Sequence, residues 1–522
     1  MPQKYGKHPC GCTASTDLFE CAKSPIFRVN NRRHLKILKI FPGINSIPDG
    51  FYHSLTRGTH YHQQSKVFRG TVYLVIFLAG LAACRKPISE PKTPKPDPAE
   101  YTQYGTPYTS LPNAEQLVMY EVNLRALGPN PNLQGVIQKL THIRSLGTNV
   151  LWLMPIYPIG QLRGINSPYC VRDYKSVSNE YGSLADLRML TDSAHALGMA
   201  VILDWVANHT AWDHPWMTND GWHSTNAAGD VIHPPGTNWQ DVAELNFNNT
   251  DMRRAMQDAM KYWLLEANVD GFRCDYADGV PYDFWQETWL DIRSLPNRNF
   301  LFLAEGSRAD HFNAGFDLAF SWTWYNALKQ VYAGQSVQRL IDADRQEYLN
   351  TPAGSAWLRF TTNHDESAWD ATPVSLFGGI QGALAASAAT FALGGVPLMY
   401  SSQEMGTTGR VPFFSVSQLN WSANPAMLQT YRNTLGFYSA NPIVRTGTRD
   451  IYPHPDVLSV HRSGSNRAVW WLVNLRNQGK TVVVPPNHQG IDWSEQLTGT
   501  TLNTTDSISL LPYQILLLHR NF

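Results

Sequence analysis

The stretch Asn268–Asp278 reads N-V-D-G-F-R-C-D-Y-A-D. Its apolar residues predict a short strand, and because side chains alternate between the faces of a strand, Arg273 and Asp275 point the same way. A guanidinium beside a carboxylate favours the ionised form, which lowers the pKa of the carboxyl group and fixes its orientation. A carboxylate that acts as a nucleophile must be ionised and held in a fixed orientation. On this stretch alone, a structural ion pair at a strand end is the simpler interpretation.

Strand-like and helix-like segments alternate from about residue 115. This alternation predicts a parallel sheet covered by helices. Eight such strands close into a (β/α)8 barrel, whose active site lies at the C-terminal strand ends, and a doubly wound open sheet is the alternative on pattern alone. Besides the central strand, the expected strands are Leu117–Asn123, Asn149–Met154, Ala200–Val206, Phe300–Glu305, Phe316–Ser321, Trp357–Thr362 and Pro397–Ser401, and the clearest helices are Leu133–Leu146, Leu184–Leu197 and Met252–Ala267.

Two further regions flank or interrupt the predicted barrel, which spans residues 111–440. Residues 212–245, after the third strand, are rich in Gly, Pro, Asn, His and Trp and are expected to form a short inserted subdomain. Residues 441–522 contain short β-rich runs separated by Gly, Asn and Pro, which predict a C-terminal antiparallel β-sandwich. Its strands are expected at Val457–His461, Ala468–Val473, Thr481–Val484 and Gln514–His519.

The N-terminal part carries a predicted export signal. A basic flank at Lys66 and Arg69 precedes the apolar run 71–83, and the end of that run, L-A-A-C at residues 81–84, resembles a bacterial lipobox. Residues 66–84 are therefore expected to be a lipoprotein signal peptide with Cys84 as the lipidated residue, and residues 85–110 a Pro-rich tether. Residues 1–65 are expected to be absent from the mature protein. This predicts an exported, membrane-anchored bacterial lipoprotein, with the periplasmic and cell-surface sides both open.

Composition narrows the class of ligand. Lys+Arg and Asp+Glu both number 42, so the formal net charge is zero. This balance argues against nucleic-acid binding and against an electrostatic membrane patch.

The six cysteines form no disulfide framework, and Cys170 and Cys274 are expected to be buried, inert thiols.

Ionisable residues recur where the predicted strands end. They include Asp204-Trp-Val-Ala-Asn208-His209, the Arg273–Asp275 pair, Glu305 at the end of an apolar strand, and Asn363-His364-Asp365. Burial is expected to raise the pKa of Glu305. Each residue alone has an ordinary structural role as a cap or a core side chain. A barrel brings them to one rim, so together they predict a functional site.

This set resembles the alpha-amylase family of retaining glycoside hydrolases, from about Tyr120 to the C-terminus. The motifs that carry the resemblance are D-x-x-x-N-H at Asp204–His209, G-x-R-x-D at Gly271–Asp275, Glu305, and N-H-D at Asn363–Asp365. The family fold that the resemblance implies is a (β/α)8 barrel with a subdomain inserted after the third strand and a C-terminal β-sandwich.

The resemblance also implies roles for single residues. It makes Asp275 the nucleophile, Glu305 the acid/base and Asp365 the residue that stabilises the transition state. The matching substrate-binding residues are Arg273, which orients the nucleophile, His209 and His364, which bind the sugar at the cleavage site, and Tyr169, which stacks under that sugar. Asn208 matches a residue that often ligates structural calcium in this family. A site for calcium, a site for sodium and the absence of a metal all remain open. The implied chemistry requires no cofactor.

The implied activity is retaining hydrolysis of alpha-glucosidic bonds in starch-like glucans or maltooligosaccharides. The alternatives are glycosyl transfer from the same site and, less favoured because all three carboxylates are present, a non-catalytic glycan-binding or transporter-accessory protein. Many starch-cutting members carry Lys-His three and four residues after the nucleophile, whereas this chain has Asp278 and Gly279. This departure leaves open the sugar site beyond the scissile bond. Linkage and chain-length preference and oligomeric state are open as well.

Overall fold

The computed structural model describes residues 101–401 and 403–522. The predicted signal peptide, the lipidation site Cys84 and residues 85–100 of the predicted tether lie outside these residues. Residues 101–110, the end of the predicted tether, are docked on the following domain: Tyr101 Oη donates to Asp258 at 2.5 Å and Tyr104 Oη donates to Asp192 at 2.7 Å. None of the helices in the described ranges combines the length and the apolar character needed to cross a bilayer.

Eight parallel strands close into a barrel in the order β1-β10-β9-β8-β7-β6-β3-β2. The closed barrel confirms the predicted (β/α)8 class and rules out the open sheet. All eight predicted strands are present, and the ends of the seven whose ranges were predicted shift by at most three residues. They are β1 Met119–Val122, β2 Val150–Leu153, β3 Ala200–Trp205, β6 Gly271–Cys274, β7 Leu301–Ala304, β8 Leu318–Phe320, β9 Ala356–Arg359 and β10 Val396–Tyr400.

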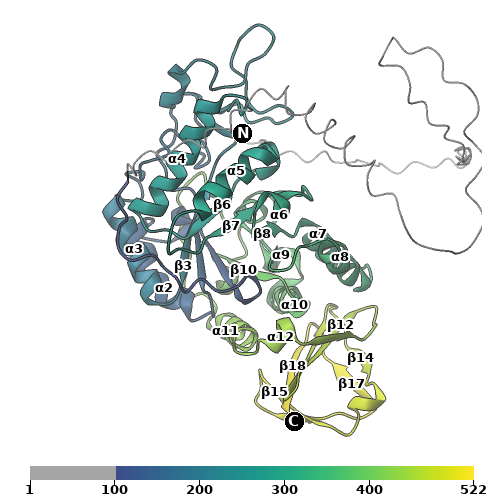
Figure 1. The fold of residues 1–522 in the computed structure, drawn as a ribbon. Helices are drawn as coiled ribbons and strands as arrows, with labels where there is room; N and C mark the ends of the chain where they lie inside the picture. Colours follow the sequence, from purple (N-terminus) through teal and green to yellow (C-terminus); the bar gives the residue numbers. More distant parts are fainter. Residues whose placement is uncertain (1–100, 402) are drawn as a thin grey trace, which may run out of the picture. The chain divides into compact units, whose positions relative to one another are not determined.

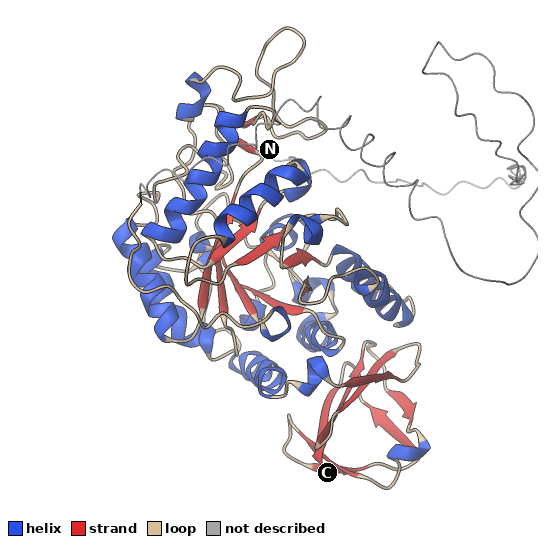
Figure 2. Cartoon of the chain, in the orientation of Figure 1, coloured by secondary structure: helices blue, strands red, loops and turns tan. Residues whose placement is uncertain are grey.

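Helices surround the strands, as Figure 2 shows in blue around red. Polar side chains start several of them: Asn249 accepts hydrogen bonds from the first amides of α4, and Ser183 and Asp186 form a capping box on α3. The helices are α2 Leu133–Arg144, α3 Leu184–Ala196, α4 Thr250–Glu266, α5 Tyr282–Arg293, α6 His311–Ala314, α7 Trp322–Tyr332, α8 Gln338–Tyr348, α9 Pro373–Leu376, α10 Gly379–Ala392, α11 Pro425–Ala440 and α12 Ile443–Thr446.

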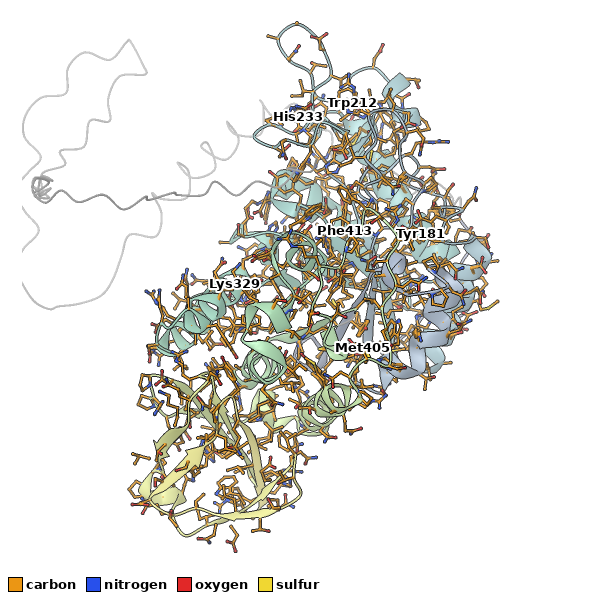
Figure 3. The ribbon with its side chains drawn as sticks, turned by 180° about the vertical axis from the view of Figure 1, so that it is seen from behind. Tyr181, Trp212, His233, Lys329, Met405 and Phe413 are labelled. Carbon is orange, nitrogen blue, oxygen red and sulfur yellow. The ribbon has the colours of Figure 1, made fainter. Side chains whose placement is uncertain are left out.

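The segment between β3 and α4 forms the inserted subdomain. Its antiparallel strands β4 (His209–Ala211) and β5 (Val242–Glu244) place His209 opposite Glu244. The loops between β4 and β5 carry Trp212 and His233, which Figure 3 labels. Cys170 packs against this pair of strands and is buried, as predicted, and Cys274 is buried as well.

The C-terminal region is antiparallel, as predicted, and forms a six-stranded and a two-stranded sheet (yellow in Figure 1). It is joined to the barrel by ionic and polar contacts: Arg449 Nη1 pairs with Asp344 of α8 at 2.9 Å, and buried Arg462 donates to the carbonyl of Leu393 at 3.0 Å. Its strands are β11 Thr448–Ile451, β12 Val457–Ser463, β13 Arg467–Asn474, β14 Lys480–Val483, β15 Asp492–Glu495, β16 Thr501–Asn503, β17 Ser507–Leu510 and β18 Ile515–Asn521.

Gly271 allows the central strand to pair with its neighbour. Its φ of 152° lies in a region that side chains disfavour, and an added Cβ would overlap the carbonyl group of Leu301 on β7. We expect Gly271→Ala to lower the free energy of unfolding by roughly 2–4 kcal/mol, from backbone strain and steric overlap together. Urea denaturation measures this loss.

The control for this prediction is Gly198→Ala. Gly198 has a φ of 71° but has open space where a Cβ would stand, so this variant carries backbone strain without steric overlap. Equal losses of stability in the two variants would show that contact with β7 does not constrain position 271.

Candidate active site

One buried arginine binds three carboxylates at the C-terminal ends of adjacent strands. Arg273 of β6 is fully buried. Its Nη1 atom lies 2.7 Å from Asp204 Oδ1 of β3 and 3.1 Å from Asp275 Oδ1, and its Nη2 atom lies 2.9 Å from Glu305 Oε2 beyond β7. Two terminal nitrogens of one guanidinium therefore hold the predicted nucleophile and the predicted acid/base side by side. The expected shared direction of Arg273 and Asp275 is confirmed.

The pKa of Asp275 differs from the expectation. Burial raises the pKa of Asp275 to about 7, against the lowering effect of Arg273 and with a further rise from Asp204. The expected lowering is therefore wrong, because burial outweighs the effect of Arg273, whose single charge is shared among three carboxylates. Burial likewise raises the pKa of Glu305 to about 7, as expected, and that of Asp204 to about 6.

A second cluster surrounds His364. Its Nδ1 atom lies 2.5 Å from Glu121 Oε1, and its Nε2 atom lies 2.8 Å from the hydroxyl oxygen of Tyr169 and 3.3 Å from Asp365 Oδ2. The ring of Tyr169 stacks on His364 at 5.3 Å between centroids, and its hydroxyl donates to Asp204 at 3.1 Å. The structure thus joins Tyr169, His364 and Asp365 to the carboxylates that surround Arg273.

Charge pairing separates Asp365 from the other carboxylates. Burial acts to raise the pKa of Asp365, but His364 and Arg273 outweigh it and hold that pKa below its usual value. Burial disfavours the charged form of His364, yet Asp365 and Glu121 raise the pKa of His364 well above its usual value. The imidazolium is therefore stable between two carboxylates, and Asp365 is anionic beside it.

His209 and Asn208 lie at the junction of the barrel and the insert. The ring of His209 makes an edge contact with Trp239, whose own ring contacts Tyr276 at 5.0 Å. Burial lowers the pKa of His209 to about 4, so this imidazole is neutral at pH 7. The side chain of His209 hydrogen-bonds to the backbone of Tyr169, which connects it to the cluster around His364.

The role of Asn208 as a calcium ligand stays a prediction. Calcium takes about six to eight oxygen ligands, with carboxylates usually among them. Within residues 101–401 and 403–522, no group of three or more His, Cys, Asp or Glu side chains is arranged to hold a metal ion. The Asn208 amide nitrogen approaches His209 Nδ1 at 3.4 Å, whereas a calcium ion would bind the amide oxygen.

Two neighbours of His364 were not predicted from the sequence. Glu121 is fully buried on β1, and a charged residue inside the apolar strand M-Y-E-V was a usable signal. Phe413, labelled in Figure 3, makes edge contacts with both Tyr169 and His364. Phe413 lies in an irregular loop after β10, where no periodic pattern distinguishes it.

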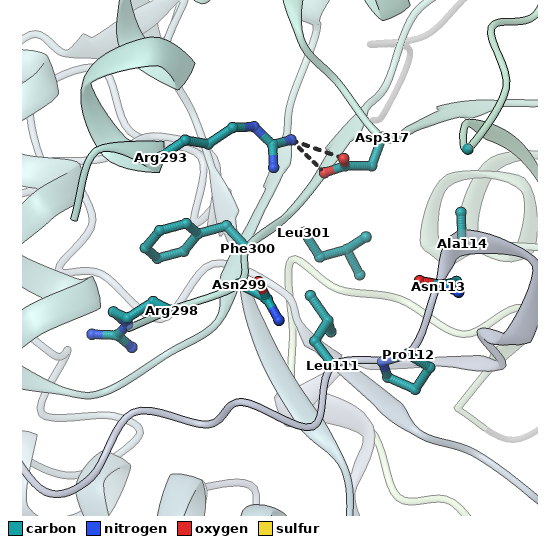
Figure 4. A pocket seen from close by; sticks show the side chains of 11 residues that line it. Leu111, Pro112, Asn113, Ala114, Arg293, Arg298, Asn299, Phe300, Leu301 and Asp317 are labelled. Carbon is teal, nitrogen blue, oxygen red and sulfur yellow. Dashed lines mark hydrogen bonds and ion pairs between the residues drawn. The ribbon is translucent and has the colours of Figure 1, made fainter. Parts of the chain in front are cut away.

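A pocket of about 400 Å³ lies elsewhere (Figure 4). It is lined by Asn113 and Ala114 before β1, by Leu301 at the start of β7, and by Asp317 before β8, which pairs with Arg293 at 2.8 Å. These positions are the N-terminal ends of the strands, whereas active sites of such barrels lie at the C-terminal ends. We assign this pocket no part in the chemistry.

Comparisons with known proteins agree with the barrel fold. Residues 128–238 match the model of the alpha amylase catalytic domain. The chain is 28% identical over 464 residues to alpha-amylase MalA of Haloarcula japonica, covering 80% of this chain and 67% of that relative. It is 29% identical to oligo-1,6-glucosidase of Parageobacillus thermoglucosidasius over 192 residues, 31% of this chain and 33% of the relative.

A solved structure extends the comparison to the fold. The crystal structure of an alpha-amylase from Lactobacillus plantarum superposes with a TM-score of 0.71 at 26% sequence identity, covering 78% of this chain and 99% of the other. The barrel, the carboxylate cluster and these matches define the protein as a glycoside hydrolase, which cleaves O-glycosyl bonds. The chain is thus similar to alpha-amylases over about four fifths of its length.

Proposed function

We propose that this protein is a retaining hydrolase that cleaves alpha-glucosidic bonds in starch-like glucans or maltooligosaccharides. The observation that carries the proposal is the sharing of Arg273 by Asp275 and Glu305, through Nη1 at 3.1 Å and Nη2 at 2.9 Å. Retaining enzymes need two carboxyl groups only about 5 Å apart, without room for a water between them and the sugar. Two carboxylates on one guanidinium suit that geometry.

In the first step, Asp275 attacks the anomeric carbon of the bound sugar. A carbon–oxygen ester bond forms to Asp275 while the glycosidic carbon–oxygen bond breaks, and Glu305 gives its proton to the leaving oxygen. Tyr276 N donates to Glu305 Oε2 at 2.9 Å, and Arg273 pairs with the same oxygen, so Oε1 is the oxygen available to carry the proton toward the substrate.

In the second step, Glu305 takes a proton from a water molecule. The resulting hydroxyl group attacks the anomeric carbon and releases Asp275 as a carboxylate, so the anomeric configuration is retained. Asp365, anionic beside His364, stabilises the positive charge that develops on the sugar ring in both transition states.

The coupled carboxylates predict activity with a bell-shaped pH profile centred near neutral pH. The active form holds one proton, on Glu305, and has Asp275 ionised. Because burial raises the pKa of both groups to about 7, acid adds a second proton and removes the nucleophile, and alkali removes the proton of the acid. Values of kcat/KM, measured from initial rates between about pH 4 and 10, test this profile. An optimum near pH 4 would contradict the raised pKa of Asp275.

A panel digest tests the proposed function. Starch, pullulan, cyclodextrins, maltose and trehalose are incubated with the enzyme, and the products are resolved by size and anomeric form. We expect alpha-anomeric products from at least one alpha-glucan. Beta-anomeric products would exclude retention, and binding without release of reducing ends would favour a glycan-binding protein. Elongated maltooligosaccharides would favour transfer to a sugar acceptor over hydrolysis.

The matched relatives bear on linkage. Their names include alpha-amylase and oligo-1,6-glucosidase. We propose alpha-1,4 bonds as the main target because the alpha-amylase match covers 80% of this chain, against 31% for the oligo-1,6-glucosidase match. Faster release of reducing ends from isomaltooligosaccharides than from maltooligosaccharides would overturn this choice.

We also propose that a lipid anchor at Cys84 holds the enzyme on the membrane. The proposal rests on the basic flank, the apolar run and L-A-A-C at residues 81–84, followed by a Pro-rich segment. Mass spectrometry of the mature protein from membranes tests it. Diacylglycerol on an N-terminal Cys84 is expected, and peptides from residues 1–65 in the mature protein would refute it.

A further inference from the structure

The loop that follows Glu305 is fastened by the carboxylate of Asp278. Asp278 accepts hydrogen bonds from the backbone amides of Ser307 at 2.9 Å and Arg308 at 3.1 Å, and from the hydroxyl of Ser307 at 3.1 Å. One side chain thus binds two consecutive amides immediately beyond Glu305. Arg308 returns a contact by donating to the carbonyl of Asp278 at 3.3 Å.

His311 completes this anchor from the other side of the loop. It is buried at the start of α6, and its Nε2 atom lies 2.6 Å from Asp278 Oδ1. Burial acts to raise the pKa of Asp278, but the bonds from His311 and from the loop amides outweigh it, and that pKa lies well below its usual value. Asp278 is therefore ionised at neutral pH.

The segment that carries Asp278 also holds Glu305 itself. The amide of Tyr276 donates to Glu305 Oε2, and the amide of Ala277 donates to the Glu305 carbonyl, both at 2.9 Å. Gly306 lies so close to the anchor that an added Cβ would overlap both Asp278 and His311. The anchor, the backbone of 276–277 and Glu305 are therefore linked by direct contacts, so we expect loss of the anchor to loosen the segment that carries the acid.

We propose that Asp278 and His311 are positioning residues that fix the carboxyl group of Glu305 against the leaving oxygen. The inference rests on the proposed function, in which Glu305 is the acid/base. The proposal also accounts for the departure from the family pattern at Asp278. Here the carboxylate of Asp278 holds the loop that follows Glu305, and this position does not present a cationic side chain to the sugar beyond the scissile bond.

The test compares substrates that differ in their need for an acid. Maltotriose has a poor leaving group that must be protonated, whereas alpha-maltosyl fluoride releases fluoride with little acid assistance. We expect Asp278→Asn to lower kcat on maltotriose roughly 10- to 100-fold with KM nearly unchanged, because a misplaced acid loses much of its catalytic effect. Pre-steady-state fluoride release should stay within about twofold of the wild-type rate, since that step needs no proton from Glu305.

A matched control and a rescue separate positioning from general damage. Asp310 lies in the same loop, and its carboxylate contacts the Arg308 side chain at 2.9 Å rather than the loop amides, so Asp310→Asn should leave both substrates unaffected. His311→Ala should reproduce the defect of Asp278→Asn, and His311→Gln, which retains a donor, should recover part of it. His311→Ala also tests the anchor if Asp278→Asn fails to fold.

The outcomes are distinct. Equal losses on maltotriose and on alpha-maltosyl fluoride, or unchanged rates on both, would overturn the positioning role of Asp278. If the wild-type enzyme forms no glycosyl-enzyme and hydrolyses neither substrate, the proposed function itself fails. The assignment is supported by a selective loss of activity on maltotriose together with intact fluoride release. Azide should not relieve that loss, because azide replaces water only in the base-assisted second step.

Discussion

Asp275→Asn and Glu305→Gln should each remove nearly all turnover of maltooligosaccharides while leaving the fold intact. The amide in Asp275→Asn cannot form the glycosyl ester, so we expect a loss of roughly 10⁴-fold or more in kcat. The amide in Glu305→Gln cannot give or take the proton, which costs roughly 10²- to 10⁴-fold. Steady-state release of reducing ends from maltotriose measures both losses.

The activated substrate distinguishes the two roles. Glu305→Gln should still react with alpha-maltosyl fluoride and accumulate the glycosyl-enzyme, which azide then releases, whereas Asp275→Asn should form no covalent intermediate. Asp317→Asn is the matched control, because Asp317 is a carboxylate bound to Arg293 at the opposite end of the barrel. Wild-type rates in either active-site variant, with unchanged circular dichroism, would refute the assignment.

Arg273→Met should damage both stability and activity. Removing a buried partner leaves the remaining charges uncompensated, which costs about 3–5 kcal/mol of unfolding free energy. Without the guanidinium, the pKa values of Asp204, Asp275 and Glu305 rise further above their unfolded values. Raised carboxyl pKa values contribute stability at low pH that is lost as the pH rises through them. The variant should therefore lose more stability at about pH 8 than at about pH 5, as urea denaturation at each pH will show.

The activity of Arg273→Met should fall roughly 10²- to 10³-fold, and the acid side of its pH profile should move upward, because Asp275 ionises at higher pH. Arg359→Met is the control. Arg359 is equally buried and pairs with Asp344 at 3.1 Å and Glu347 at 3.0 Å on the helix side of β9. It should cost similar stability without moving the pH profile. A shift of equal size in both variants would refute the link between Arg273 and Asp275.

The barrel could be predicted because its signals are local. Each strand is a short apolar run between turn residues, and Asp275 and Glu305 directly follow two of these runs, so the topology alone brought them to one rim. Arg273 and Asp275 are two residues apart on one strand, which made their shared direction certain once the strand was recognised. Family motifs then supplied roles that the pattern could not.

Apart from the raised pKa of Glu305, the electrostatics could not be predicted from such local signals. Glu121 meets His364 across 243 residues of sequence, and Asp204 reaches Arg273 across 69. The pKa of Asp275 depends on how many carboxylates share one guanidinium and on how little water enters, and both are properties of the closed barrel. The anchor formed by Asp278 and His311 is likewise invisible in a chain where the two residues are 33 positions apart.

The dryness of the carboxylate cluster has a practical consequence for anyone wishing to adapt this enzyme to acidic conditions. Since burial raises the pKa of Asp275 more than the nearby Arg273 lowers it, additional lysines on the exposed rim would do little. Trimming the aromatic cover that Phe413 forms on Tyr169 and His364, so that water comes closer to the carboxylate cluster, is the more direct route. That cover is made by a loop outside the regular elements, which makes it the part of the barrel mouth most open to redesign.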